Sequence, residues 1–187
     1  MIDAPLAQLA ETYARDVRLA STSGVSAEPE AQLTVPVSEF LRAFSSVTGI
    51  GDLSLLREAQ LDGVRPDFAA LIDGRPCGWV ELKAPGHTVI GEKWRGREKG
   101  QWDLLSQLDA LLVSNGDEIA LYVSGSPVDT AFLPVDGVAG WDADRLRTVL
   151  EQFTLAQPRP ITRVSQLADR LAPLARFLRA VSYTHLR

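Results

Sequence analysis

The feature that most constrains the fold is a pair of apolar runs separated by the dipeptide Asp73-Gly74. The runs cover Phe68–Ile72 and residues 77–84, and Pro85-Gly86 follows the second run. Asp-Gly between two such runs is a strong signal for a tight hairpin turn. We therefore predict an antiparallel pair of strands that turns at Asp73-Gly74 and ends at Pro85.

This hairpin gathers charged side chains that are otherwise far apart in the sequence. Residues two apart on a strand project from the same face, so Glu81 and Lys83 point together. Asp67 opens the first strand and returns toward the same end of the sheet. Two converging carboxylates suit Mg²⁺, which also keeps several waters and binds phosphate oxygens. A lysine beside such an ion offsets phosphate charge and holds an attacking water.

A simpler alternative is that Glu81 and Lys83 are a solvated pair on an edge strand, with Asp67 as an ordinary turn residue. Bulky apolar residues surround the charged pair, since Val80 and Leu82 flank Glu81 directly. A wholly exposed strand has no need of them, because apolar side chains gain free energy mainly when they are buried. The sequence therefore favours a strand with one buried face.

The remaining sequence predicts a mixed α/β domain. Apolar spacing of three and four residues predicts helices, and short apolar runs between turn residues predict strands. The predicted helices cover residues 4–19, 30–47, 101–111, 142–153 and 164–180, with Asp142 as an N-cap and an irregular first turn near Pro36. The predicted strands cover 53–61, 68–72, 77–84, 111–113 and 119–123; loops cover 21–29, 87–100 and the segment after 123.

Composition narrows the class of protein. The chain has 187 residues, 45% of them hydrophobic and 23% charged, which is typical of a folded domain. One cysteine, Cys77, excludes an intrachain disulfide and a multi-cysteine zinc site. The sequence shows no signal-peptide pattern and no membrane-length apolar run, so we expect a cytoplasmic protein without a membrane partner.

Net charge alone does not favour a nucleic-acid partner. The formal net charge is −5, whereas nucleic-acid binders usually carry a basic surface. A local basic segment does occur directly after the predicted hairpin, and phosphate neutralisation needs such a cluster. The predicted DNA-binding residues are Lys93, Trp94, Arg95, Arg97 and Lys99, with Trp94 stacking on a base. The alternative is a solvated loop whose charge is diluted by Glu92 and Glu98.

Pro66-Asp67 followed by Glu81-Leu82-Lys83 resembles the PD-(D/E)xK motif of the restriction-endonuclease-like nuclease superfamily. The resemblance implies a central mixed sheet flanked by helices. It also implies Asp67 and Glu81 as ligands of Mg²⁺, with Mn²⁺ as a substitute, and Lys83 as the catalytic lysine. Members often add an acidic residue from an upstream helix, for which Glu30 is the candidate and Glu39 the alternative. Some members place a glutamine on the next helix, which Gln101 matches.

A narrower resemblance covers residues 30–123. The runs Glu81–Gly86, Lys93–Trp102 and Ser114-Asn115-Gly116 are similar to nuclease domains at the N-terminus of bacterial restriction-modification proteins. In that group an N6-adenine DNA methyltransferase usually follows, so the resemblance implies DNA and a downstream methyltransferase or helicase domain as partners. No Asn-Pro-Pro-Tyr-like run occurs in this chain.

The predicted organisation has three parts. Residues 1–156 form the nuclease-like domain, 157–180 a helical connector to a further domain, and 181–187 a tail that resembles a translated sequencing adapter. The function expected from the resemblance is magnesium-dependent hydrolysis of DNA, as an endonuclease. Two alternatives stay open: a catalytically idle nuclease-like module that binds DNA or a partner, and an α/β interaction domain whose motif is accidental.

Overall fold

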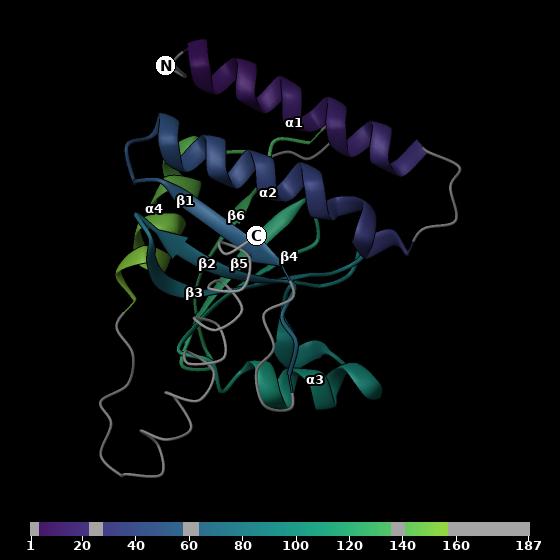
Figure 1. Ribbon diagram of the computed structural model, residues 1–187. Coiled ribbons are helices and arrows are strands. Elements are labelled where there is room, and N and C mark those ends of the chain that lie inside the picture. The colour runs from purple at the N-terminus through teal and green to yellow at the C-terminus, as the bar shows by residue number, and fades with distance from the viewer. Residues whose placement is uncertain (1–3, 23–27, 58–63, 136–140, 157–187) are drawn as a thin grey trace, which may run out of the picture.

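A six-stranded mixed sheet forms the centre of the protein (Figure 1). The structure, a computed structural model, describes residues 4–22, 28–57, 64–135 and 141–156. Its helices are α1 (Ala4–Thr22), α2 (Pro29–Val47), α3 (Arg97–Leu105) and α4 (Ala143–Leu155), with a short 3-10 turn, η1 (Gly91–Lys93). Its strands are β1 (Leu53–Arg57), β2 (Phe68–Ile72), β3 (Arg75–Leu82), β4 (Ala110–Ser114), β5 (Glu118–Val123) and β6 (Ser126–Phe132).

The strands lie in chain order across the sheet, from β1 to β6. Strands β3 and β4 are parallel, and every other neighbouring pair is antiparallel. A parallel pair needs a crossover connection, and here the segment that holds η1 and α3 supplies it. The predicted mixed α/β class is therefore confirmed, and the two central strands are joined by the segment that carries the basic cluster.

The predicted hairpin between β2 and β3 is confirmed. Asp73 and Gly74 both have positive φ angles, 49° and 76°, as a two-residue type I′ turn requires. Phe68 pairs with Val80 and Ala69 with Trp79, so the register places Asp67 across from Glu81. The hairpin therefore sets Asp67 opposite Glu81 at the end of β3.

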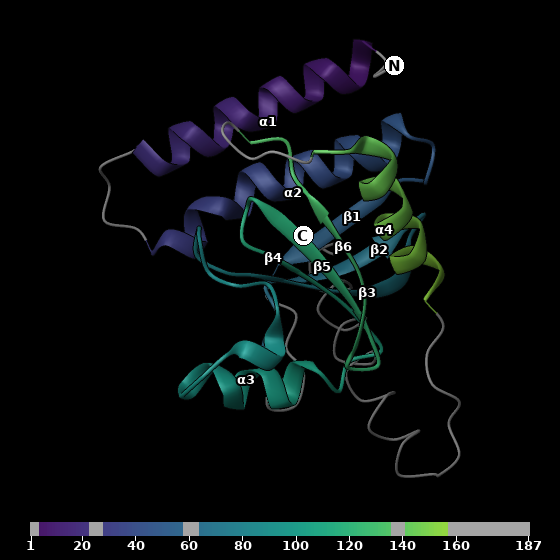
Figure 2. The same cartoon turned by 180° about the vertical axis from the view of Figure 1, so that it is seen from behind.

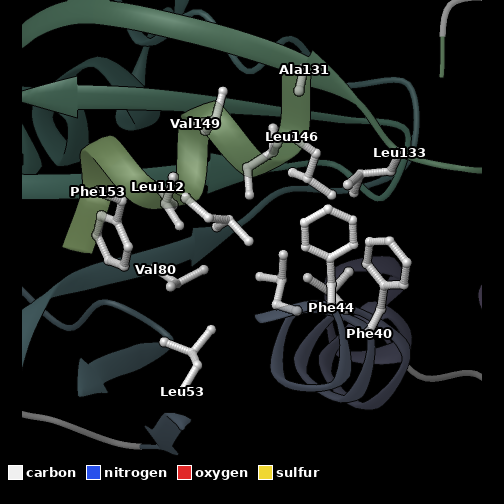
Figure 3. Close-up of a cluster of buried hydrophobic side chains, with 14 of the residues drawn as sticks. Phe40, Phe44, Leu53, Val80, Leu112, Ala131, Leu133, Leu146, Val149 and Phe153 are labelled. Atoms are coloured by element: carbon white, nitrogen blue, oxygen red, sulfur yellow. The ribbon is translucent and has the colours of Figure 1, made fainter. Parts of the chain in front are cut away.

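Helices cover both faces of the sheet. Figures 1 and 2 show α2 against one face with α1 outside it, and α3 on the opposite side. Figure 3 shows Phe44 of α2 and Phe153 of α4 in one cluster with Val80 and Leu112 of the sheet, and Phe40 at its edge beside Leu133. These side chains belong to the larger core cluster, and each is at most 2% exposed.

Successive side chains along β3 point to opposite faces of the sheet. Val80 and Leu82 of β3 belong to the larger core with α2 and α4. Trp79 packs against a second apolar cluster on the α3 side, which includes Trp94 and Trp102. Because side chains alternate along a strand, Glu81 and Lys83 share the Trp79 face. The candidate charged residues therefore lie under α3 and the crossover segment.

Helix boundaries follow local signals. Pro29 occupies the first turn of α2, where a missing N–H costs no intrahelical bond. Asp142 caps α4 as predicted, since its Oδ1 accepts hydrogen bonds from the N–H groups of Asp144 (2.9 Å) and Arg145 (3.3 Å). Pro36 lies inside α2, and the helix runs without a break from Pro29 to Val47.

Three predicted boundaries are corrected by the structure. Helix α3 spans Arg97–Leu105 rather than 101–111, because Gly96 (φ 58°) starts it early and Ala110 already belongs to β4. The predicted loop 87–100 contains η1 and the first turn of α3. A strand, β6, replaces part of the predicted loop after residue 123. It is a mostly exposed edge strand, and buried and exposed residues alternate only weakly along it.

Some predictions fall outside the described residues. These are the end of the first strand at 58–61, the helix at 164–180, the connector at 157–180 and the tail at 181–187. Within the described ranges, the structure contains no helix of the length and apolarity needed to cross a membrane.

Candidate active site

Asp67 and Glu81 meet at the end of the β2–β3 hairpin. Asp67 Oδ2 accepts a 2.6 Å hydrogen bond from the backbone N–H of Leu82, which ties its carboxylate to β3 next to Glu81. Beyond the last residue of β3, the Lys83 N–H donates to Ser114 O at 2.8 Å and so extends the pairing with β4. The predicted convergence of the three residues on one end of the sheet agrees with the structure.

Lys83, Glu81 and Gln101 form a closed hydrogen-bonded triangle. Lys83 Nζ donates to Glu81 Oε1 at 2.8 Å and to Gln101 Oε1 at 3.1 Å. Gln101 Nε2 donates to the same Glu81 Oε1 at 2.6 Å. Glu81 and Lys83 are each 3% exposed, so both charges are removed from bulk water. The structure therefore brings Gln101, on α3, into the same site as the residues of β3.

Glu30 approaches the site from the first turn of α2. Its Oε1 lies 3.9 Å from Lys83 Nζ, and its side chain is 42% exposed. Glu39 is nine positions later, which is two and a half helical turns and so the opposite face of α2. Glu39 lines a cavity of about 190 Å³ against α1, together with Tyr13 and Asp16. Of the two acidic candidates on this helix, Glu30 is the one that reaches the site.

The electrostatics of the site are dominated by burial. Burial raises the pKa of Glu81 to about 7, although the ammonium of Lys83 opposes the shift and the nearby Asp67 and Glu30 add to it. Asp67 is exposed as a residue, but the Leu82 N–H holds its carboxylate against β3. That partial burial raises the pKa of Asp67, while the Leu82 N–H, Lys83 and Arg57 lower it.

One carboxylate oxygen of this site is unsatisfied. Glu81 Oε2 is buried and has no hydrogen-bond partner within the part of the chain that the structure describes. Leaving a buried polar atom unpaired costs free energy, so such atoms commonly mark a functional group or a missing ligand. Glu81 therefore has one oxygen held by Lys83 and Gln101 and one buried oxygen without a partner among the described residues.

The donor set fits a hard cation that takes few protein ligands. In the described ranges, no three histidine, cysteine or acidic side chains lie close enough to hold an ion by themselves. Mg²⁺ typically binds through one or two carboxylates, with water and substrate phosphate completing its octahedron. Asp67, accessible to solvent, and the unpaired Glu81 Oε2 match that requirement, whereas a zinc site with four protein ligands does not fit.

The basic segment lies at the surface beside this site, except for its tryptophan. Lys93, Arg95, Arg97 and Lys99 are exposed, as binding of phosphate requires. Trp94 is only 1% exposed, and its indole Nε1 donates to Thr88 O at 2.9 Å. The prediction that Trp94 stacks on a base is wrong, because its ring is packed in the second core cluster.

Sequence reasoning missed three features of the site. The ring of Trp94 faces Lys83, with 4.7 Å between Nζ and the ring centroid. Arg57 of β1 lies near enough to Asp67 to lower the pKa of that carboxyl. Asn115 is buried and its Nδ2 donates to His87 O at 2.7 Å, tying the turn after β4 to the loop after β3. Each depends on contacts between distant segments, so no local pattern could reveal it.

Comparisons with known proteins support the fold. No protein-family model matches the sequence, and no curated protein matches it. Among solved structures, the chain is similar to a cryo-EM structure of a DrdV–DNA complex, with a TM-score of 0.57 and 18% sequence identity. The similarity covers 81% of this chain but 14% of the DrdV chain. At this identity the likeness concerns the arrangement of helices and strands, and it assigns no role to a residue.

Proposed function

We propose that this chain is a magnesium-dependent DNA nuclease domain of the PD-(D/E)xK type, belonging to a restriction-modification or phage-defence protein. The observation that carries the proposal is Glu81, a buried carboxylate with one oxygen on Lys83 and Gln101 and the other unpaired. Asp67 lies next to it on the paired strand. A buried, unsatisfied carboxylate is costly to maintain, and a function at this position explains its presence.

Asp67 and Glu81 are the residues that would hold the ion, through Glu81 Oε2 and the solvent-accessible carboxylate of Asp67. When bound, Mg²⁺ polarises a phosphate oxygen and lowers the pKa of a coordinated water. The raised pKa of Glu81 in the metal-free protein is consistent with a site built for a cation, since nearby positive charge stabilises the ionised form.

Lys83 supplies the positive charge for the reacting phosphate. Its ammonium is held at one position by Glu81, Gln101 and Trp94, so little reorganisation is needed when a phosphate arrives. Gln101 orients this pair by donating to Glu81 Oε1 and accepting from Lys83 Nζ. The exposed Lys93, Arg95, Arg97 and Lys99 provide the nearby phosphate contacts.

DNA as the substrate is supported by two observations. The exposed basic residues lie in the crossover segment beside the site, although the whole chain is acidic. The similar solved structure is of DrdV in complex with DNA. From the resemblance of Glu81–Gly86 and Lys93–Trp102 to nuclease domains of restriction-modification proteins, we further propose a methyltransferase or helicase domain as a partner of this chain.

Plasmid cleavage tests this function. Purified protein is incubated with supercoiled plasmid in Mg²⁺, in Mn²⁺ and in excess chelator, while DNA binding is measured in parallel by fluorescence anisotropy. We expect nicked or linear product with either ion and none in chelator. Binding without cleavage under all conditions identifies an idle nuclease-like module instead. The absence of both binding and cleavage, also when the chain is expressed within the full-length protein, leaves an α/β interaction domain with an accidental motif.

A further inference from the structure

The side chain of Lys83 is enclosed on one side by an aromatic ring. Its Nζ lies 4.7 Å from the centroid of the Trp94 ring, inside the range of about 6 Å in which a cation is attracted to an aromatic face. Its Nζ also lies near oxygens of Glu81, Gln101 and Glu30. The ammonium therefore has polar partners and an aromatic partner, and it is only 3% exposed.

Trp94 is itself held firmly. Its Nε1 donates to Thr88 O at 2.9 Å, which fixes the rotation of the indole. Trp102 packs against it at a steep angle, with 5.6 Å between ring centroids, and His87 does so at 5.9 Å. A residue that bound DNA by stacking would need an open ring face, whereas this ring is 1% exposed. Its burial within a charged segment therefore calls for another explanation.

We propose that Trp94 is a positioning residue: its ring contacts the ammonium group of Lys83 and holds that group beside Glu81 and Gln101. The proposal rests on the function proposed above, because it explains how the lysine is fixed for phosphate chemistry. An ammonium on a flexible four-carbon stem has many rotamers, and removing the aromatic wall lets it leave the site. The ring also excludes water, which strengthens the electrostatic contacts of Lys83.

Two substitutions at Trp94 distinguish the effect of its aromatic face from the effect of its side-chain volume. Trp94→Phe keeps an aromatic face but loses the hydrogen bond to Thr88, whereas Trp94→Met keeps much of the volume without a ring. Trp141→Met is the matched control, because Trp141 packs on Phe40 and Phe44 in the other core cluster. All variants are assayed below the onset of thermal unfolding, with protein in excess over DNA and at a concentration that saturates the observed rate, so that affinity does not enter it.

Single-turnover cleavage is the first readout. We expect Trp94→Met to lower the rate by about tenfold or more, and Trp94→Phe to retain a rate within a few-fold of wild type. Trp141→Met should cleave at the wild-type rate even if it melts earlier. A folded Trp94→Met protein that cleaves as fast as wild type overturns the proposal, as does an equal loss in Trp94→Phe and Trp94→Met.

A second readout does not depend on cleavage. The sequence contains three lysines, Lys83, Lys93 and Lys99, so ¹³C-lysine labelling gives a spectrum that three single Lys→Arg variants can assign. Protons above a ring face are shielded, so the ε-methylene signal of Lys83 should lie upfield of the exposed Lys93 and Lys99. Trp94→Met should abolish this shift and Trp141→Met should keep it. An unshifted Lys83 signal in wild type overturns the proposal, while an upfield signal without cleavage overturns the proposed function alone.

Discussion

Lys83 Nζ lies 2.8 Å from Glu81 Oε1, while Oε2 of the same carboxylate is buried without a hydrogen-bond partner in the described part of the chain. A pair of charges buried at 3% exposure each rarely adds to stability, because desolvation offsets their attraction. The pair is therefore better understood as part of a binding site than as a stabilising salt bridge. Its consequences are measurable in the metal-free protein.

The stability of the metal-free protein should depend on pH through Glu81. Its pKa is raised from 4.5 to about 7 in the folded state, so between these values the folded state binds more protons than the unfolded state. The free energy of unfolding should therefore fall as pH rises from about 4.5 through about 7, by up to about 3 kcal/mol. Urea denaturation in chelator at pH 5 and pH 8 measures this difference.

Glu81→Gln is the variant that isolates this effect, because the amide cannot ionise. We expect it to be more stable than wild type at pH 8 and to lose most of the pH dependence in this window. Some dependence should remain, since burial also raises the pKa of Asp67 and of Asp117. Identical pH profiles for wild type and Glu81→Gln would show that Glu81 is not the titrating group.

Substitution of a carboxylate and substitution of the lysine should have different effects on Mg²⁺ affinity. Asp67→Ala and Glu81→Ala should each weaken Mg²⁺ binding by at least about tenfold, since each removes one of the two carboxylates proposed to hold the ion. Lys83→Ala should bind Mg²⁺ at least as tightly as wild type, because an ammonium is not a ligand and competes for Glu81. Isothermal titration at pH 8 measures all three, with Glu39→Ala as a control on the far face of α2. Equal loss in Lys83→Ala and Glu81→Ala contradicts the assignment.

The exposed basic residues should contribute to DNA affinity without reading sequence. Lys93→Ala and Arg97→Ala should weaken binding on any sequence and each lower the salt-dependence slope by about 1, as expected for a phosphate contact. Arg147→Ala is the matched control, because Arg147 is a half-exposed arginine on α4, the helix that covers the other face of the sheet. Anisotropy titrations from low to high salt measure the slopes. Unchanged slopes in both basic-segment variants would place the DNA elsewhere.

Two glycines should respond oppositely to alanine. A Cβ at Gly78 would lie 2.4 Å from Phe153 Cε2 and 2.8 Å from Ala110 O, so Gly78→Ala should destabilise the protein by about 1–3 kcal/mol or more. Gly100 lies inside α3 with open space around it, so Gly100→Ala should stabilise the helix by about 0.5–1 kcal/mol. Urea denaturation of both variants checks the close packing of α4 on β3. A neutral Gly78→Ala would contradict that packing.

The sequence predicted the part of the fold that local chemistry controls. The β2–β3 hairpin follows from two apolar runs and an Asp-Gly turn, both of which act within a few residues. The meeting of Asp67, Glu81 and Lys83 then follows from strand geometry alone. Local patterns do not predict Gln101 and Glu30 at this site, because their approach to Lys83 depends on how α3 and α2 pack on the sheet. A family resemblance suggested both residues.

What the sequence could not predict depends on tertiary contacts. The flanking charges of Trp94 indicate an exposed loop, but Trp102 and the loop after β3 bury its ring. Strand β6 carries Pro127 and an irregular exposure pattern, so its sequence does not indicate a strand, and in the structure it pairs with β5 at the edge of the sheet. The charged segment 87–100 was predicted as a loop, yet α3 already begins at Arg97, directly after Gly96 at φ 58°.

The central claim is that Asp67, Glu81 and Lys83 form one catalytic centre, and single-turnover plasmid cleavage in Mg²⁺ by alanine variants tests it most directly. Asp67→Ala, Glu81→Ala and Lys83→Ala should each lower the rate by at least about a hundredfold while keeping a cooperative thermal melt. Glu39→Ala should cleave like wild type. A folded Lys83→Ala or Glu81→Ala protein that cleaves at the wild-type rate would contradict the account.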